Sequence, residues 1–262
     1  MISSQQPPSS RTASSAVPKL MFFGDPHGDF KPIIAAVQRY RPEAIILLGD
    51  VQARQPLHVE LRSIRDLTQI WFIHGNHDTD SDADYDNLWG SELADRNLHG
   101  RVVEIAGYRV AGLGGVFRGR IWNPDEPKAN APFRSRADLL RHVTRGGTVE
   151  GPWRGGFARK HLSSIFLYEY EAMLGLEADI LVSHEAPAAA PGGAYAGRHI
   201  GFQAIDHLAV SMGASLAVHG HHHRAIDYVH EGLMSASAPF RAFGVDMGSH
   251  LAWPLVDGRG PR

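Results

Sequence analysis

Five short apolar runs in this chain each end in a small group of glycine and polar residues. The runs are Leu20 to Phe23, Ile45 to Leu48, Ile70 to Ile73, Ile180 to Val182 and Leu216 to Val218. Uniformly apolar runs bounded by glycine or polar residues are typical of buried parallel strands. Because the carboxyl ends of such strands meet in one crevice of an α/β fold, we expect the five polar groups to lie together.

These polar groups contain the side chains that bind divalent metal ions. They are Gly24-Asp25-Pro26-His27-Gly28, Gly49-Asp50, Gly75-Asn76-His77-Asp78, Ser183-His184-Glu185 and Gly220-His221-His222-His223. Imidazole nitrogen together with carboxylate and amide oxygen suits such ions. One of these groups alone is more often a turn than a set of ligands. Five of them at strand ends predict a metal site.

In this order the motifs resemble those of the calcineurin-like metallophosphoesterase superfamily, over the stretch Met21 to His223. The resemblance implies an α/β protein, a four-layer α-β-β-α sandwich with mixed sheets. It also implies two divalent metal ions, for which we expect Mn²⁺ before Fe, Zn²⁺, Ni²⁺ or Co²⁺. The implied activity is hydrolysis of a phosphomonoester or phosphodiester, with a nucleotide or another small phosphate as the expected substrate.

The resemblance distributes seven ligands over the two ions. The first ion is expected to take Asp25, His27, Asp50 and His223, and the second Asp50, Asn76, His184 and His221. Asp50 is the expected bridge, because a bridging ligand must be a bare carboxylate. The outer imidazoles of the last motif lie two residues apart on an extended backbone and share a face, so His222 is expected to point elsewhere. His219 with His221 is an alternative pair, but only the later pair directly follows a glycine.

Two further side chains are expected to act on the substrate. By resemblance His77 faces the leaving-group oxygen, as a general acid or as an imidazolium that stabilises the substrate. The protein-phosphatase branch orients this histidine with a second carboxylate, but Ala53 occupies that position here, which leaves Asp78 or Asp80. Arg54 stands where that branch has a phosphate-binding arginine, and a guanidinium fork suits phosphate oxygens.

The rest of the chain predicts helices and antiparallel strands around the parallel core. Apolar residues at helical spacing predict helices over 30–40, 162–173 and 202–212. Val102 to Leu113, with Ala106-Gly107 in the middle, predicts a hairpin, and 225–252 is expected to add closing strands. With 262 residues, 43% of them hydrophobic, the chain can bury one large core, so we expect a single domain over 19–262.

Residues 118–160 lose this periodicity and predict a long basic loop or insertion. The segment contains eight arginines and two lysines against four acidic residues, a net charge of +6 in a chain of net charge −2. Two roles are open: a cap that attracts an anionic substrate, including Arg134, Arg136 and Arg141, or an ordinary solvated insertion. Trp122 and Trp153 either stack on a base or anchor the segment on the core.

Composition limits the partners and the location. The near-neutral charge gives no general argument for nucleic acid or an anionic membrane. The absence of cysteine excludes thiolate ligands and suits the cytoplasm. Residues 1–18 have no apolar stretch and predict a disordered tail rather than a secretory signal. No apolar run is long enough for a membrane span, so we expect a soluble, cytoplasmic protein without a membrane partner.

Three other functions remain open at this point. The DNA-repair branch of the superfamily shares these motifs, so a nuclease on single-stranded or broken DNA or RNA is one alternative, although the chain has no recognisable nucleic-acid module. A serine/threonine protein phosphatase is the second alternative. Ala53 and Asp78 disfavour it, because that branch has a second carboxylate at the position of Ala53 and a glutamate at the position of Asp78. A non-catalytic scaffold would lack ligands or the acid, whereas all seven ligands and His77 are present.

Overall fold

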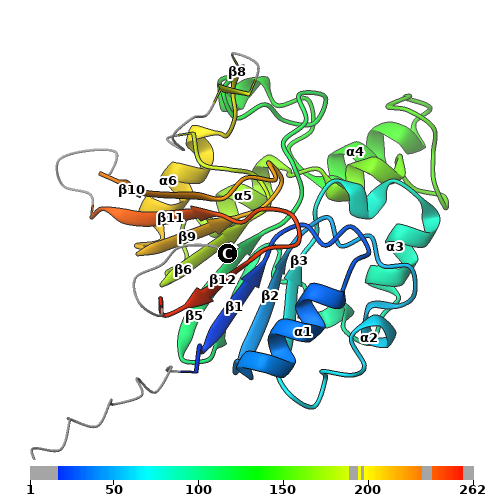
Figure 1. The fold of residues 1–262 in the computed structure, drawn as a ribbon. Helices are drawn as coiled ribbons and strands as arrows, with labels where there is room; N and C mark the ends of the chain where they lie inside the picture. Colours follow the sequence, from blue (N-terminus) through cyan, green and yellow to red (C-terminus); the bar gives the residue numbers. More distant parts are fainter. Residues whose placement is uncertain (1–16, 189–193, 196–197, 232–237, 256–262) are drawn as a thin grey trace, which may run out of the picture.

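The computed structural model describes residues 17–188, 194–195, 198–231 and 238–255. Two mixed β-sheets pack face to face, and helices cover the outer face of each sheet (Figure 1). This is the α/β class and the four-layer α-β-β-α sandwich that the resemblance implies. The tail predicted for residues 1–18 lies outside the described residues, apart from Val17 and Pro18.

The first sheet contains three of the predicted parallel strands. In spatial order its strands are β12 (His250–Trp253), β1 (Leu20–Phe23), β2 (Ala44–Leu48) and β3 (Gln69–Ile73). β1, β2 and β3 run parallel, and β12 is antiparallel to β1. The loops that follow β1, β2 and β3 therefore leave the sheet at the same end.

The second sheet contains the two remaining predicted parallel strands. In spatial order its strands are β10 (Ile226–His230), β11 (Phe240–Gly244), β9 (Leu216–His219), β6 (Ile180–Ser183), β5 (Tyr108–Leu113) and β4 (Arg101–Ile105). The four central strands are parallel, and an antiparallel strand lies at each edge. The predicted hairpin is β4 with β5. A short pair, β7 (Ala194–Tyr195) and β8 (Arg198–His199), lies outside both sheets.

Each strand of the core contributes side chains to two apolar layers. In β1, Leu20 and Phe22 belong to the layer between the sheets, whereas Met21 and Phe23 belong to the layer under the outer helices. Burial on both faces explains why these strands appear in the sequence as continuous apolar runs rather than as alternating patterns. The layer between the sheets takes side chains from β1, β2 and β3 on one side and from β5, β6 and β9 on the other. It holds the two sets of strand ends together.

Helices complete the two outer layers. The α-helices of the described residues are α1 (Lys31–Tyr40), α2 (Leu57–Glu60), α3 (Asp82–Trp89), α4 (Arg136–Thr144), α5 (Leu167–Met173) and α6 (Gln203–Ser211). α1 and α2 bury Val37 and Leu57 against the first sheet, and α5 and α6 bury Tyr170 and Leu208 against the second. α1 and α6 are the helices predicted over 30–40 and 202–212. No helix among the described residues has the length and apolar character of a membrane span.

The segment 118–160 differs from a plain loop because it contains α4, a helix of nine residues. A capping box starts this helix: Ser135 Oγ accepts a hydrogen bond from the Asp138 N–H, and the Asp138 carboxylate accepts one from the Ser135 N–H. A capping box stabilises the first turn by polar contacts. Leu139 is the one buried residue of α4, so the apolar spacing that normally reveals a helix in the sequence is nearly absent.

The helix predicted over 162–173 begins only at Leu167. Before it, the chain forms a short 3-10 helix, η4 (Arg159–Ser163), and then an extended segment. In that segment the Ile165 N–H donates to the carbonyl of Val116, whose own N–H donates to the carbonyl of Ser163. These backbone hydrogen bonds to a distant segment outweigh the helical spacing of the local apolar residues.

Candidate metal centre

The loops after the parallel strands hold the predicted ligands in an unusual backbone conformation. Positive φ angles occur at Asp25 (30°), His27 (43°), Asp50 (45°), Gln52 (42°), His221 (69°) and His223 (48°). A side chain disfavours this region, because the β-carbon approaches the backbone. Such strain persists where the surrounding structure imposes it, and it is concentrated at functional sites. Five of the seven predicted ligands share this feature.

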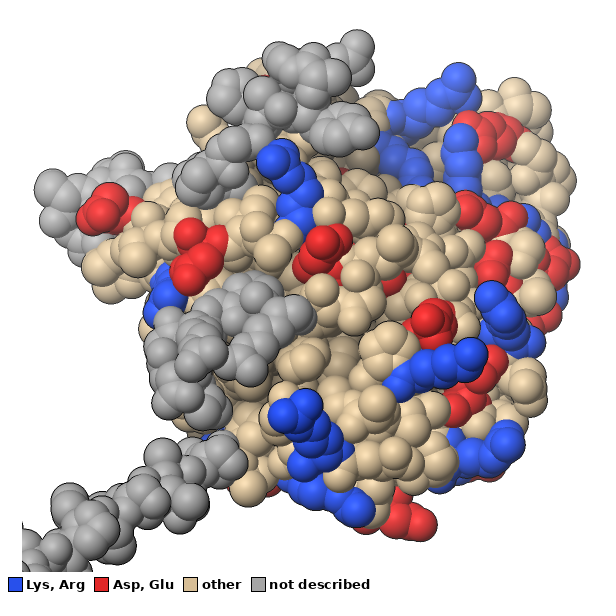
Figure 2. Space-filling view, in the orientation of Figure 1, with Lys and Arg blue, Asp and Glu red and all other residues tan. Residues whose placement is uncertain are grey.

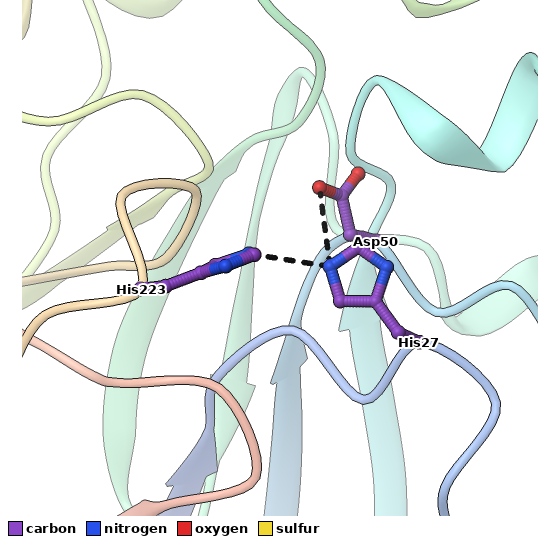
Figure 3. Close-up of side chains that lie close together, drawn as sticks. All are labelled: His27, Asp50 and His223. Carbon is purple, nitrogen blue, oxygen red and sulfur yellow. Dashed lines mark hydrogen bonds and ion pairs between the residues drawn. The ribbon is translucent and has the colours of Figure 1, made fainter.

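His27, Asp50 and His223 form a first donor cluster, in which one ligand atom of each residue lies within 4.8 Å of the others. His27 Nε2 lies 3.2 Å from His223 Nε2 and 4.0 Å from Asp50 Oδ2 (Figure 3). Two ligands that bind one ion at about 2.1 Å lie about 3 Å apart. The spacing of the two imidazole nitrogens therefore suits a shared metal ion.

Asp50, His184 and His221 form a second donor cluster of the same kind, so the Asp50 carboxylate belongs to both. His184 Nε2 lies 3.4 Å from Asp50 Oδ2 and 3.2 Å from Asn76 Oδ1. Asn76 thereby brings an amide oxygen to this cluster. Asp50 is 1% exposed and is the residue that the two clusters have in common.

Asp25 is fully buried beside both clusters. Its Oδ1 lies 3.6 Å from His184 Nδ1, and its Oδ2 lies 3.8 Å from His223 Nε2 and accepts a hydrogen bond from the His221 N–H. Oδ1 has no hydrogen-bond donor among the described residues. Burial raises the pKa of Asp25 to about 7. A buried carboxylate with an unsatisfied oxygen is unfavourable on its own, and a bound cation would satisfy it.

The electrostatics of the second cluster also favour a cation. His184 is fully buried, and burial opposes its charged form. The carboxylates of Asp50 and Asp25 outweigh that effect and raise the pKa of His184 to about 10. A metal ion bound by this imidazole would take the place of its proton, since a histidine ligand must be neutral.

Glycines of the motifs leave the space that the ligands occupy. A β-carbon on Gly75 would lie 2.2 Å from Asp50 Oδ1, and one on Gly49 would lie 2.4 Å from His184 Nδ1. Both distances are far below van der Waals contact. The glycines are therefore needed for the close approach of neighbouring loops around the ligands.

Two groups outside the predicted set orient the imidazoles. Gln52 Oε1 lies 2.6 Å from His27 Nδ1, and the carbonyl of Leu48 lies 2.8 Å from His184 Nδ1. In both rings the bonded Nδ1 leaves Nε2 facing the donor cluster. Nothing in the sequence marks Gln52 except its place two residues after Asp50.

His77 takes Asp80 as its partner, one of the two residues that the sequence left open. His77 Nδ1 lies 2.5 Å from Asp80 Oδ2, and the His77 N–H donates to Asp50 Oδ1. Burial opposes the charged form of His77, but the hydrogen bond to Asp80 and the charge of Asp50 outweigh it and raise the pKa of His77. The His77 ring lies 5.5 Å from the His27 ring, next to the first cluster.

Asp78, the other possible partner of His77, connects two loops instead. It is fully buried, and its two carboxylate oxygens accept hydrogen bonds from the backbone N–H groups of Gln52 and Gly75. These contacts connect the loop after β2 to the loop after β3. Asp78 therefore supports the ligand geometry without facing His77.

Arg54 is exposed and lies over the loop that carries His27. A β-carbon on Gly28 would lie 3.3 Å from Arg54 Nε. Among the described residues, no hydrogen bond or ion pair is found for the Arg54 guanidinium. The side chain is near the first cluster and free to contact an anion there.

The histidine-rich motif contributes His221 and His223 to the donor clusters, as in the favoured pairing. His219 is buried on β9, and a β-carbon on Gly244 would lie 2.9 Å from its ring. His222 belongs to neither cluster that contains Asp50. It forms a separate group with Glu185 and His221, in which Glu185 Oε2 lies 3.9 Å from His221 Nε2.

Most cations of the segment 118–160 are paired with carboxylates. The pairs are Arg120 and Lys160 with Glu150, Lys128 and Arg134 with Glu171, Arg136 with Glu169, Arg141 with Asp138, Arg154 with Asp86, and Arg159 with Asp82. Figure 2 shows basic and acidic side chains alternating on the side of the molecule where α3 and α4 lie. The positive charge of the segment is thus largely neutralised. Within the described residues, its cations without an ion pair are Arg118 and Arg145.

Both tryptophans of this segment anchor it. Trp122 is buried and packs edge-on against Phe117 in the core of the second sheet. Trp153 donates from Nε1 to Asp82 Oδ1 at 2.9 Å and packs against Tyr85, both on α3. These contacts favour the anchoring role over stacking on a base.

Comparisons with known proteins agree with this fold. The sequence model of calcineurin-like phosphoesterases matches residues 18–225. An uncharacterized protein of Haemophilus influenzae is 41% identical over 210 residues, which cover 80% of this chain and 85% of that protein. The crystal structure of TT1561 of Thermus thermophilus matches with a TM-score of 0.52 and 16% identity, over 94% of this chain and 97% of that chain, and supports the fold alone.

The chain belongs to the calcineurin-like phosphoesterase family. Proteins of this family are metal-dependent hydrolases of phosphoric esters and typically bind two divalent ions.

Proposed function

We propose that this chain hydrolyses a small phosphomonoester or phosphodiester, such as a nucleotide, with two bound divalent metal ions, Mn²⁺ before other metals. The observation that carries the proposal is the Asp50 carboxylate, which is shared by the donor clusters of His27 with His223 and of His184 with His221. Asp25 would complete the first metal shell and Asn76 the second. The family membership supports the reaction class.

The residues around the clusters have separate tasks in this proposal. The seven ligands would hold the two ions, which when bound would supply positive charge to the phosphate group and lower the pKa of a bound water. His77, held through Nδ1 by Asp80, faces the leaving group with Nε2 and donates a proton to its oxygen. Arg54, beside the His27 loop, contacts the phosphoryl oxygens.

Replacing Asp50 tests the proposal. Asp50→Asn removes the shared charge, so we expect loss of at least one metal ion per chain and of nearly all activity. Elemental analysis of the purified variant measures the first effect. Asp66→Asn is the control, because Asp66 is exposed on another part of the chain and loses the same charge. Two ions retained per chain in Asp50→Asn would contradict the bridging role.

A substrate panel separates the proposed activity from its alternatives. The Mn²⁺-loaded protein is assayed with p-nitrophenyl phosphate, bis(p-nitrophenyl) phosphate, cyclic nucleotides, single-stranded DNA and a phosphoserine peptide. Turnover of the small esters supports the proposal. Turnover of DNA alone would establish a nuclease, and turnover of the peptide alone a protein phosphatase. No turnover by protein that holds two ions would contradict a catalytic role.

A further inference from the structure

Arg118 is a half-buried cation whose charge is not paired among the described residues. Its Nη1 donates to Ser164 Oγ at 3.1 Å and to Ser163 Oγ at 3.3 Å. Two neutral hydroxyl groups therefore fix the guanidinium without compensating its charge. Arg145, the other unpaired cation of the segment 118–160, is exposed and is not held in this way.

A short chain of hydroxyl groups connects Arg118 to the second donor cluster. Ser163 Oγ lies 2.7 Å from Thr79 Oγ1, and Thr79 Oγ1 donates to the carbonyl of Asn76 at 3.2 Å. Asn76 supplies the amide oxygen of that cluster. The guanidinium is thus two hydroxyl groups away from a proposed metal ligand.

The backbone before Arg118 is tied to the same cluster from another direction. The Phe117 N–H donates to Glu185 Oε1 at 3.1 Å, and Glu185 directly follows His184. The other oxygen of Glu185 lies 3.9 Å from His221 Nε2. Arg118 is therefore connected to the second cluster through Ser163 and Thr79 and through Glu185, whereas Arg54 lies next to the loop of the first.

The surroundings of Arg118 carry further positive charge. Arg120 and Lys160 share one carboxylate, Glu150. Burial lowers the pKa of Arg118, and the carboxylates of Glu185, Asp80, Glu150 and Asp50 act against this effect. The guanidinium remains charged at neutral pH. Arg118 thus has two further cations, Arg120 and Lys160, in its surroundings, and these two pair with a single carboxylate.

We propose that Arg118 is the anchor of an anion subsite beside the second cluster, and that this subsite binds a second phosphate group of the substrate. The inference rests on the proposed function, in which the phosphate to be cleaved lies on the metal ions. A guanidinium two hydroxyl groups away from Asn76 is placed for the neighbouring phosphate. Its fork suits two phosphate oxygens, and Arg120 and Lys160 add attraction at longer range. The substrate class is a compound with two adjacent phosphates, such as a nucleoside diphosphate.

The test compares two nucleotides that differ by one phosphate. AMP and ADP are used as competitive inhibitors of p-nitrophenyl phosphate hydrolysis at a fixed free Mn²⁺ concentration, and as titrants in calorimetry of the Mn²⁺-loaded protein. We expect ADP to bind about 10- to 100-fold more tightly than AMP, the range for a charge-assisted hydrogen bond. Arg118→Gln should abolish most of this preference and change the binding of AMP little. Arg118→Lys, which keeps the charge but not the fork, should retain part of it.

Arg145→Gln is the matched control, because it removes the same charge from an exposed position in the same segment. It should leave the preference for ADP unchanged. Equal binding of AMP and ADP by the natural protein, or an undiminished preference in Arg118→Gln and Arg118→Lys, would overturn the subsite. An equal loss of affinity for both nucleotides in Arg118→Gln would also overturn it.

Calorimetry separates the subsite from the proposed function. A preference for ADP that depends on Arg118 supports the subsite even if no ester is hydrolysed. Hydrolysis without that preference supports the proposed function alone.

Discussion

His77 is held differently from the other histidines of the site. Its Nδ1 contacts Asp80, which belongs to neither donor cluster, and its side chain is 44% exposed. The imidazoles of His27 and His184 instead have Nε2 directed at Asp50. At the scale of single residues, this predicts that proton transfer and metal binding can be separated by mutation.

His77→Asn should leave the metal content unchanged and lower kcat by about 10²–10⁴. The loss should be largest for esters with poor leaving groups, because these need the proton most. Elemental analysis and a series of aryl phosphates of different leaving-group pKa measure the two effects. Asp80→Asn should show the same trend with a smaller loss. An equal loss for all leaving groups in His77→Asn would assign His77 to substrate binding instead.

Gly75→Ala tests the steric role of the motif glycines. The added β-carbon would lie 2.2 Å from Asp50 Oδ1, so the carboxylate or the loop must move. We expect a loss of bound metal and about 1–3 kcal/mol of the free energy of unfolding. Gly175→Ala is the control, since a β-carbon there meets no atom within 4 Å. Normal metal content and stability in Gly75→Ala would show that the loops adapt.

That the motif residues lie together could be predicted from the sequence, because each follows a strand in a short polar motif. The division of Asp50, His184 and the other ligands between two ions came from the resemblance to a family and stays a prediction. Gln52 and Arg118 could not be found in this way, since their roles depend on contacts with His27 and with Ser163 and Ser164 that only the fold creates.

At the scale of elements, Glu169 connects α5 to two other parts of the chain. Its Oε1 lies 2.5 Å from Arg136 Nε on α4, and its Oε2 lies 3.5 Å from His99 Nε2, just before β4. Burial alone would raise the pKa of Glu169. The contact with His99 and the charge of Arg136 outweigh burial and lower this pKa to about 2.

This lowered pKa predicts a pH-dependent contribution to stability. The carboxylate stabilises the fold fully above its unfolded pKa of about 4.5, and the contribution is lost as the pH falls from there to about 2. Glu169→Gln should therefore lower the free energy of unfolding by about 1–3 kcal/mol at pH 7, with a smaller difference at pH 3. Denaturant titrations at both pH values measure it, with exposed Glu177→Gln as the control. A difference independent of pH would show that packing, not charge, is responsible.

The elements of the core could be predicted, whereas those around the basic segment could not. β1, β2, β3, β6 and β9 are continuous apolar runs, so their burial is visible in the sequence. α4 starts with the polar capping box of Ser135 and Asp138 and buries one residue. The late start of α5 depends on hydrogen bonds to Val116, which is far away in the sequence. Long-range backbone pairing of this kind leaves no local pattern.

At the scale of the whole molecule, the proposed ligands come from both sheets. Asp25, Asp50 and Asn76 follow strands of the first sheet, and His184, His221 and His223 follow strands of the second. Asp50 contacts ligands of both sheets. Bound metal ions would therefore connect the two halves of the sandwich, in addition to the apolar layer between them.

Metal ions that bind only the folded chain must stabilise it. At a free concentration of about 1,000 times Kd the gain is about 4 kcal/mol for one ion. We expect Tm to rise with the Mn²⁺ concentration and to fall when a chelator removes the metal, as measured by scanning calorimetry. Asp66→Asn should respond as the natural protein does, whereas Asp50→Asn should respond weakly, because both clusters lose their shared carboxylate. A Tm that is the same with Mn²⁺ and with chelator would show that the ions do not connect the sheets, and an equal response of the two variants would place the stabilising ion away from Asp50.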